Sequence, residues 1–154
     1  MQEIERDDWY KASSRNTIAS YTAYINSYPN GLYREDAEKK IIDKEVEDIF
    51  RGDHGVLPPA SRTSYGSSYS STSDVDIYNN TSYTLTVRYS GTESKKIVLS
   101  PGRSTNFTIK NGYYKVAASV DAANVQNYAG EETLSGGGYE STYYIETKTY
   151  QYWK

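Results

Sequence analysis

The composition of this chain changes abruptly at the Pro58-Pro59 pair. Before the pair, charged residues are interspersed with Ile, Ala and Tyr, whereas after it a Ser/Tyr-rich stretch leads into runs of Thr, Tyr and Val. Apolar residues at spacings of three and four favour helices, and Thr, Tyr and Val favour strands. We therefore expect an α+β protein of two small modules. These are a helical unit over 1–52, a loop and Ser/Tyr-rich linker over 53–74, and an antiparallel β-sandwich over 75–154.

The helical unit is expected to contain about three short helices. Trp9 and Ala12 share a face of the first helix, Asn16 is expected to cap the second, and Pro29-Asn30-Gly31 ends the second. The apolar face of the second helix is Ile18, Tyr21, Ile25 and Tyr28. That of the third is Tyr33, Ala37, Ile41, Ile42, Val46, Ile49 and Phe50. Gly52 stands where a helix C-cap is expected.

The same residues form a longer pattern. It reads Trp9-x2-Ala12, then Asn16-Thr17-Ile18-x2-Tyr21-x2-Tyr24-Ile25-x2-Tyr28-Pro29-x-Gly31-x-Tyr33-x3-Ala37-x3-Ile41. This pattern resembles the tetratricopeptide-like helical hairpin of bacterial envelope lipoproteins, which is also found beside caspase-like protease domains. The resemblance covers roughly a third of the chain. It implies a protein-interaction or spacer element and carries over no catalytic residues.

Repeats of this kind normally come in arrays, because one hairpin cannot bury its apolar face alone. This chain has a single unit, so the face that carries Ile18, Ile25, Ile41 and Ile42 needs another cover. The first helix, the β module or another molecule could supply it. Our order of preference is docking on the β module, then self-association with another copy, then a different partner.

The second module is expected to be a small Greek-key sandwich of about seven strands. Its clearest half-buried strand carries Tyr83, Leu85, Val87 and Tyr89, in alternation with polar residues. Asn111-Gly112 lies between a run ending at Ile109 and one starting at Tyr114, and this dipeptide is a strong signal for a hairpin turn. The outline is similar to immunoglobulin-like or transthyretin-like modules, although the cysteine pair of immunoglobulin domains is missing.

Charge and cysteine content limit the classes of function. The net charge is −3, and 8 basic and 12 acidic residues precede Pro58 against 9 and 8 after it. Without a basic stripe, nucleic acid is not an expected partner. The chain has no Cys, so thiolate catalysis and Cys-based metal sites are excluded. No apolar run approaches a membrane span, so we expect a soluble chain whose natural form could have lost a leader and a lipidated Cys.

Two patterns could suggest catalysis or phosphate binding. Asp53-His54 could act as a general base, but no nucleophile is marked near it, so its expected role is to cap the third helix and direct the chain outward. Gly136-Gly137-Gly138 lacks the Lys-Ser/Thr and the following helix of a phosphate loop, and a hairpin turn is expected there instead. We therefore expect no catalytic residues and no cofactor.

Oxygen-rich residues near the start of the β module suggest a metal or modification site. Asp74 and Asp76, with Asn79 and Asn80 nearby, could bind calcium, but strand alternation supplies no enclosing loop, so no metal site is expected. Asn79, Asn80 and Asn106 match the N-glycosylation pattern, which matters only in a eukaryotic secretory host. The bacterial resemblance of the helical unit argues against that host.

Tyrosine is the compositional outlier, with 18 residues against 2 Phe and 2 Trp. Most of these rings are expected to replace Phe in a thin core, with the hydroxyl in contact with water. The residues expected to point outward or to lie in the tail, where rings could bind a sugar or a protein, are Tyr78, Tyr144, Tyr150, Tyr152 and Trp153. The alternative is that 150–153 extends the last strand and covers a sandwich edge.

We therefore expect a non-enzymatic, extracytoplasmic bacterial protein, in the periplasm or at the cell surface. Its β-sandwich would contact a protein or a glycan, and the helical hairpin would serve as a spacer or docking element. The alternative from another class is an accessory module, for targeting or scaffolding, of an enzyme system such as a protease.

Overall fold

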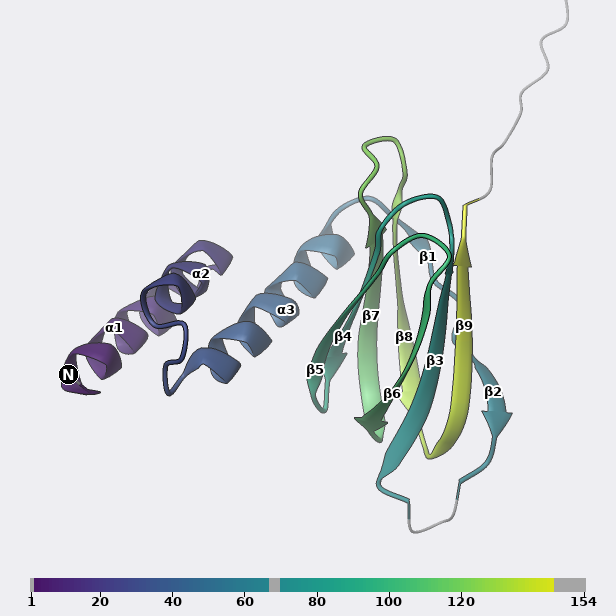
Figure 1. Ribbon diagram of the computed structural model, residues 1–154, viewed down its shortest axis with the longest axis horizontal. Helices are drawn as coiled ribbons and strands as arrows, with labels where there is room; N and C mark the ends of the chain where they lie inside the picture. Colours follow the sequence, from purple (N-terminus) through teal and green to yellow (C-terminus); the bar gives the residue numbers. More distant parts are fainter. Residues whose placement is uncertain (1, 67–69, 146–154) are drawn as a thin grey trace, which may run out of the picture.

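The computed structural model describes residues 2–66 and 70–145. Within these ranges, three helices precede nine strands, which confirms the expected α+β architecture of two modules (Figure 1). The helices are α1 (Gln2–Arg15), α2 (Ile18–Ser27) and α3 (Arg34–Arg51). The strands are β1 (His54–Val56), β2 (Ser61–Ser64), β3 (Thr72–Asn80), β4 (Leu85–Gly91), β5 (Ser94–Leu99), β6 (Ser104–Lys110), β7 (Gly112–Val120), β8 (Asn127–Leu134) and β9 (Gly137–Tyr144). None of the three helices is long and apolar enough to cross a bilayer.

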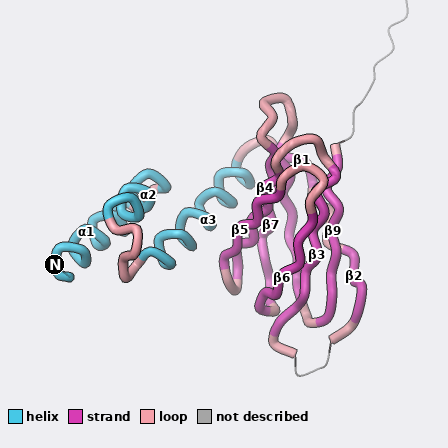
Figure 2. Tube along the Cα trace, in the orientation of Figure 1, coloured by secondary structure: helices cyan, strands magenta, loops and turns pink. Residues whose placement is uncertain are grey.

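The strands form two sheets that pack face to face. One sheet has the order β1-β8-β7-β4-β5 and the other β2-β9-β3-β6. Neighbouring strands are antiparallel except for two parallel pairs, β1 with β8 and β3 with β9. Figure 2 shows all the strands gathered at one end of the molecule and the helices at the other. Each sheet therefore contains one parallel strand pair, whereas we expected a wholly antiparallel sandwich.

The segment 53–74, expected to be a loop and linker, contributes two strands and the start of a third. β1 pairs with β8, and β2 pairs with β9. The side chain of Arg62 on β2 donates to Ser135 Oγ and to the Gly136 carbonyl, both at 2.9 Å, and its guanidinium lies over the Tyr139 ring. The Ser/Thr-rich composition predicts a linker, but here both short edge strands are paired, and Arg62 fixes β2. These two strands account for the count of nine instead of seven.

The expected hairpin at Asn111-Gly112 is wrong, because β6 and β7 belong to different sheets. The turn instead carries the chain from one sheet to the other. Asn111 is fixed by three hydrogen bonds: its backbone N–H donates to the Ser71 carbonyl at 2.9 Å, its Nδ2 to the Ser70 carbonyl at 2.8 Å, and its Oδ1 accepts from Ser73 Oγ at 2.6 Å. Gly112 has a φ of 142°, which favours glycine. The dipeptide marks a turn, but the hydrogen-bond partners of Asn111 lie at the start of β3 and just before it.

The core of the sandwich is built from alternate residues of both sheets. Leu85, Val87 and Tyr89 of β4 are buried as expected, whereas Tyr83 lies before the strand and is exposed. The buried residues of this core are Val75, Ile77, Leu85, Val87, Tyr89, Leu99, Phe107, Ile109, Tyr114, Val116, Ala118, Leu134 and Tyr139. Because the inward positions follow the two-residue period of strands, the residues between them face outward.

The helical unit has its own small aromatic core. The Trp9 ring stacks on the Tyr33 ring at 5.2 Å with parallel planes, and it contacts Tyr24 edge-on at 5.2 Å. The second helix is capped by Thr17, not by the expected Asn16, through a capping box with Ser20. Asn16 has a left-handed φ of 54°. Asparagine tolerates this conformation well, which explains its place in the turn.

Helix α3 joins the two modules. Its first half, with Ala37 and Ile41, packs in the helical core, and its second half lies on β4, β5, β7 and β8. Val46 on this second half is only 1% exposed, and Ala117 of β7 and Ala129 of β8 are also buried. α3 thus docks on the β module, but through Val46; Ile25 and Ile41, whose face was expected to dock there, pack within the helical unit instead. We call β1-β8-β7-β4-β5 the covered sheet and β2-β9-β3-β6 the open sheet.

We predict that Val46→Ala destabilises the protein by about 2 kcal/mol, because it removes two buried methyl groups and leaves a cavity. The matched control is Val98→Ala on β5, where the side chain is 59% exposed. That change should alter the free energy of unfolding by less than about 0.5 kcal/mol. Urea unfolding followed by circular dichroism measures both values. Equal losses in the two variants would show that α3 is not docked through Val46.

A second prediction concerns Gly31, in the Tyr-Pro-x-Gly segment between α2 and α3. A Cβ at this position would lie 2.5 Å from Glu5 Oε1, 2.6 Å from the Tyr24 hydroxyl and 2.9 Å from Tyr28 Cβ. Gly31→Ala should therefore cost about 1–3 kcal/mol through overpacking. Gly52→Ala is the control, because its Cβ would come no nearer than 3.5 Å to another atom. A thermal melt in which both variants match the wild type would contradict the close packing.

Candidate binding surface

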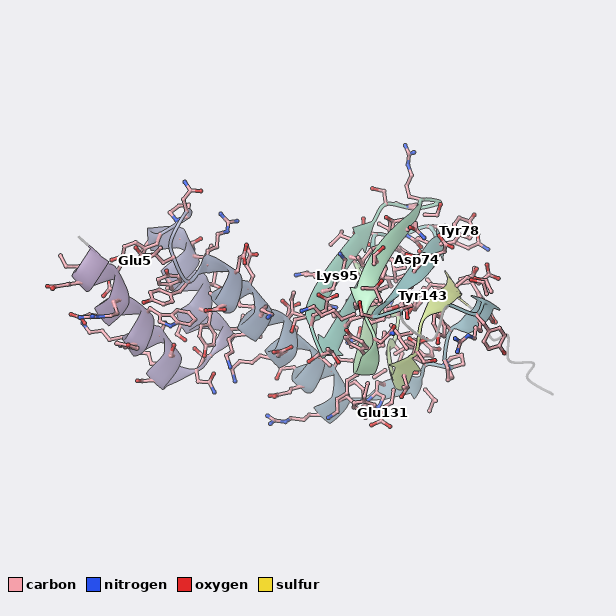
Figure 3. All side chains as sticks on the ribbon, turned by 90° about the horizontal axis from the view of Figure 1, so that it is seen from below. Glu5, Asp74, Tyr78, Lys95, Glu131 and Tyr143 are labelled. Atoms are coloured by element: carbon pink, nitrogen blue, oxygen red, sulfur yellow. The ribbon has the colours of Figure 1, made fainter. Side chains whose placement is uncertain are left out.

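The outward side of the open sheet is a face that the helices leave uncovered. The strands that α3 contacts all belong to the covered sheet. In Figure 3, Asp74 and Tyr78 of the open sheet lie on the side of the β module away from the helices, and Lys95 lies on the nearer side. Val75, Ile77 and Asn79 of β3 are buried, so the residues between them point outward. We call this outward side the open face.

Two of the five predicted aromatic residues lie on the open face. Tyr78 on β3 is 40% exposed and Tyr144 on β9 is 60% exposed. Tyr78 stands opposite Thr142, and Tyr144 is the next outward residue along β9. The rings therefore occupy diagonal positions on neighbouring strands. The other three predicted residues, Tyr150, Tyr152 and Trp153, lie outside the described residues.

Polar groups surround the two rings. Asp76 stands opposite Glu140 of β9 on one side and opposite Asn106 of β6 on the other. Asn106 Nδ2 donates to Asp76 Oδ1 at 2.8 Å, which fixes both side chains. Together with Tyr78 and Thr142, these residues line a shallow depression of about 390 Å³. Sequence alternation alone predicts that Asp76 and Tyr78 share a face, but only the β3–β9 pairing brings Glu140 beside them.

The carboxylates of β3 are engaged by neighbours on the same sheet, and no metal cluster forms among the described residues. Thr108 Oγ1 donates to Asp74 Oδ1 at 2.9 Å, just as Asn106 does to Asp76. No group of three or more metal-binding side chains occurs in residues 2–66 and 70–145. The two aspartates therefore act here as hydrogen-bonded outward residues.

Asn79, one of the glycosylation-pattern residues, is structural. It is fully buried, and its Nδ2 donates to the carbonyls of Tyr83, Leu99 and Ser100 at 2.8–3.1 Å. Its Oδ1 accepts from Thr81 at 2.7 Å. This side chain fixes the turn between β3 and β4 and is closed to a glycosylating enzyme in the folded protein.

The Asp53-His54 pair does not form a catalytic arrangement. The Nδ1 atom of His54 lies 2.9 Å from the Gly52 carbonyl oxygen, and its ring packs near Phe50 at 5.7 Å. His54 also belongs to β1, which pairs with β8. Its contacts therefore tie the end of α3 to the first strand, in agreement with the expected role at the exit of the helix.

The triple glycine forms a turn, but it joins two sheets and not the two strands of a hairpin. β8 is in the covered sheet and β9 is in the open sheet. Gly136 and Gly137 have φ angles of 96° and 79°, which side chains rarely adopt. The Gly136 carbonyl accepts from Arg62. The expected hairpin is therefore corrected to a sheet-to-sheet turn.

Sequence analysis missed a groove at one edge of the sandwich. The connection between β1 and β2, residues 57–60, crosses from the covered sheet to the open sheet there. A cavity of about 380 Å³ lies between this connection, Tyr128 of β8 and the stretch 140–144 of β9. We call it the edge groove. The Pro58-Pro59 pair is the local signal for this connection, although by composition it marks a module boundary.

A partly buried carboxyl group contacts the connection that forms one wall of this groove. Glu132 Oε1 accepts the Ala60 N–H at 2.8 Å. Burial raises the pKa of Glu132 above its ordinary value, against the opposing effect of that hydrogen bond. Burial, and then the charge of Glu132, raise the pKa of the neighbouring Tyr143 hydroxyl. The Glu132 carboxylate is thus less stable in the folded protein than in water.

Comparison with protein-family models and with curated proteins gave no match to this chain. The function is therefore argued from the surface itself.

Glu132 generates a prediction on pH dependence. A carboxyl group with a raised pKa stabilises the fold fully below its unfolded pKa, and this contribution is lost as pH rises through the folded pKa. Glu132→Gln removes that loss, so the stability of the variant relative to the wild type should increase as the pH rises from about 4 to about 7. Urea unfolding at both pH values measures the difference.

The matched control for this experiment is Glu131→Gln, which changes the exposed neighbour on the same strand. This variant keeps Glu132 and should keep the wild-type pH dependence. A stability difference between wild type and Glu132→Gln that stays constant over the pH range would contradict the prediction.

Proposed function

We propose that this protein is a non-enzymatic glycan-binding protein of the bacterial cell envelope, and that it binds through the open face of its β-sandwich. One observation carries the proposal: two exposed tyrosine rings, Tyr78 and Tyr144, follow a cluster of carboxylate and amide groups along the sheet face that α3 does not contact. The depression of about 390 Å³ gives this arrangement a concave centre.

The chemistry of these groups fits a sugar. A pyranose ring has an apolar C–H face, which an aromatic ring can cover, and hydroxyl groups at its edge. Carboxylate oxygens accept hydrogen bonds from hydroxyls, and amides both donate and accept. Asp76 uses only Oδ1 to hold Asn106. Its second oxygen and the Glu140 carboxylate can therefore receive hydroxyl groups of a sugar that stacks on the neighbouring Tyr78 ring.

The composition of the open face favours a glycan over a folded protein partner. The centres of protein interfaces are depleted in Asp, Glu and Ser and are enriched in apolar contact. Here the outward residues Asp76, Glu140, Asn106 and Thr142 are polar, and the two tyrosines stand at one end of this group. Such a polar face loses more from desolvation against a protein than against a hydroxyl-rich sugar.

The proposal includes no catalytic step. In the part of the chain that the structure describes, the single His contacts a main-chain carbonyl, and Asp76 contacts an amide. Neither lies in a nucleophile and base arrangement, which an enzyme site would require.

The helical unit is proposed to act as the spacer or docking element, and its resemblance to hairpins of envelope lipoproteins supports an extracytoplasmic site. The distance of α1 and α2 from the strands fits such a role, since α3 holds them away from the open face (Figure 1). Self-association through this unit and the accessory role in a protease system stay predictions.

The test is binding of the intact chain to an array of bacterial surface polysaccharides, followed by titration of any glycan it retains. Tyr78→Ala and Tyr144→Ala should each weaken binding at least about five-fold, because buried aromatic contacts dominate such interfaces. Tyr10→Ala, on α1 and 58% exposed, is the matched control and should leave affinity unchanged. Failure to retain any glycan, or equal losses in all three variants, would contradict the proposal.

A further inference from the structure

We propose that the edge groove binds an extended peptide with a basic side chain, which adds as a strand to the free half of β9. The observation behind this is a mismatch of strand lengths. β2 pairs with β9 only at 138–140, whereas β3 pairs with β9 along its whole length. Among the described residues, the stretch 141–144 of β9 therefore has a partner on one side only, as Figure 1 shows where β9 extends past β2.

The neighbouring connection cannot pair with this free edge. Pro58 and Pro59 have no N–H groups. The N–H of Leu57 donates to the Ala129 carbonyl at 2.9 Å, and that of Ala60 donates to Glu132. All four residues of the connection thus either lack an N–H or direct it to β8. The connection forms a wall of the groove and leaves the backbone of 141–144 available.

The free edge of β9 also lacks the protection that another edge of the sandwich has. β5 is an edge strand of the covered sheet and carries Lys95 and Lys96, and lysine at an edge discourages pairing with other chains. The free stretch of β9 reads Ser-Thr-Tyr-Tyr, with no charge and no proline. These residue types are those that favour strand pairing.

The groove fits an extended backbone with side chains on both sides. Four residues in extended form span about 13 Å. The apolar side chains beside them are Val56 and Tyr144, both exposed, and the ring of Tyr128, which lies over Gly55. In strand addition, backbone hydrogen bonds supply affinity and alternate side-chain positions supply specificity. The exposed rings provide such positions.

Charge complementarity indicates a basic residue in the peptide. Glu140 is the only charged residue among those that line the groove. Asp76 stands directly opposite Glu140 on β3, so two carboxylates lie side by side next to the first residue of the free stretch 141–144. A Lys or Arg side chain in the added strand would reduce their mutual repulsion. We therefore infer a preference for a basic residue over an acidic one.

This inference does not depend on glycan binding. The open-face depression and the edge groove share Glu140 and Thr142, and Tyr144 lines the groove, but Tyr78 belongs to the open face alone. Tyr78→Ala should therefore weaken glycan binding and leave peptide binding unchanged, so the failure of one proposal is distinguishable from the failure of the other.

The experiment uses the full chain and an acetylated, amidated seven-residue peptide, Thr-Val-Thr-Lys-Thr-Val-Thr. Hydrogen exchange with mass spectrometry should show slower exchange of the amides in 141–144 when the peptide is present. A matched peptide with Glu in place of Lys should bind at least about five-fold more weakly. Unchanged exchange over 141–144, or equal binding of the two peptides, would overturn the proposal.

Two N-methylated peptides separate strand addition from other modes of binding. In an extended chain, alternate residues direct their N–H groups to opposite sides. One peptide is methylated at its second, fourth and sixth amides, and the other at its third and fifth. One of the two should thus lose binding, because its methyl groups face β9, and the other should retain it. Equal loss or equal retention in both would overturn the proposal, and Glu140→Gln should reduce binding of the Lys peptide about two- to five-fold.

Discussion

The structure depends on the docking of α3 on the covered sheet. Val46 is buried there, and Arg88 Nε of β4 donates to Glu45 Oε2 at 2.5 Å, with both side chains largely shielded from water. Arg88 also donates to Ser119 at 3.0 Å, and Asp43 accepts from Ser90 at 2.7 Å. A shielded ion pair adds little net stability, but breaking it leaves an unpaired charge, so it fixes the register of the helix on the sheet. This contact decides which face of the sandwich stays exposed.

Tyrosine lets two small modules hold thin cores with little phenylalanine. In the helical unit, the Tyr24 hydroxyl donates to Glu5 at 2.8 Å and the Tyr28 hydroxyl to Asp8 at 2.6 Å. Burial, and then the hydrogen bond to Glu5, raise the pKa of Tyr24 to about 12, while the bond to Asp8 is the main cause that raises the pKa of Tyr28 to about 12. These bonds stabilise the fold below the ordinary tyrosine pKa and are lost only as pH rises through the raised one. The rings pack while the hydroxyls fix helix α1.

Local patterns predicted the elements but not their partners. Helix spacing and strand alternation gave the two modules, and they also placed Tyr78 and Asp76 on one face. Asn111-Gly112 was correctly recognised as a turn, but its neighbours pair with strands far along the chain, and no local signal encodes that choice. The edge groove could not be predicted for the same reason, because its walls, 57–60 and 141–144, are brought together only by the pairing of β9 with β2 and β3.

Strand β9 is where the two proposed surfaces meet. Its outward residues Glu140 and Tyr144 belong to the open face, and its free backbone borders the edge groove. A peptide paired with β9 would order residues that a glycan also contacts, so thermodynamic linkage requires each ligand to change the affinity for the other by the same factor. Whether one ligand weakens or strengthens the binding of the other depends on which of two effects is larger. Shared use of Tyr144 opposes joint occupancy, whereas a β9 already ordered by one ligand costs less to order for the second. Because Glu140 and Tyr144 are contacted directly in both cases, direct competition outweighs the ordering gain, and the two ligands are expected to bind with negative coupling.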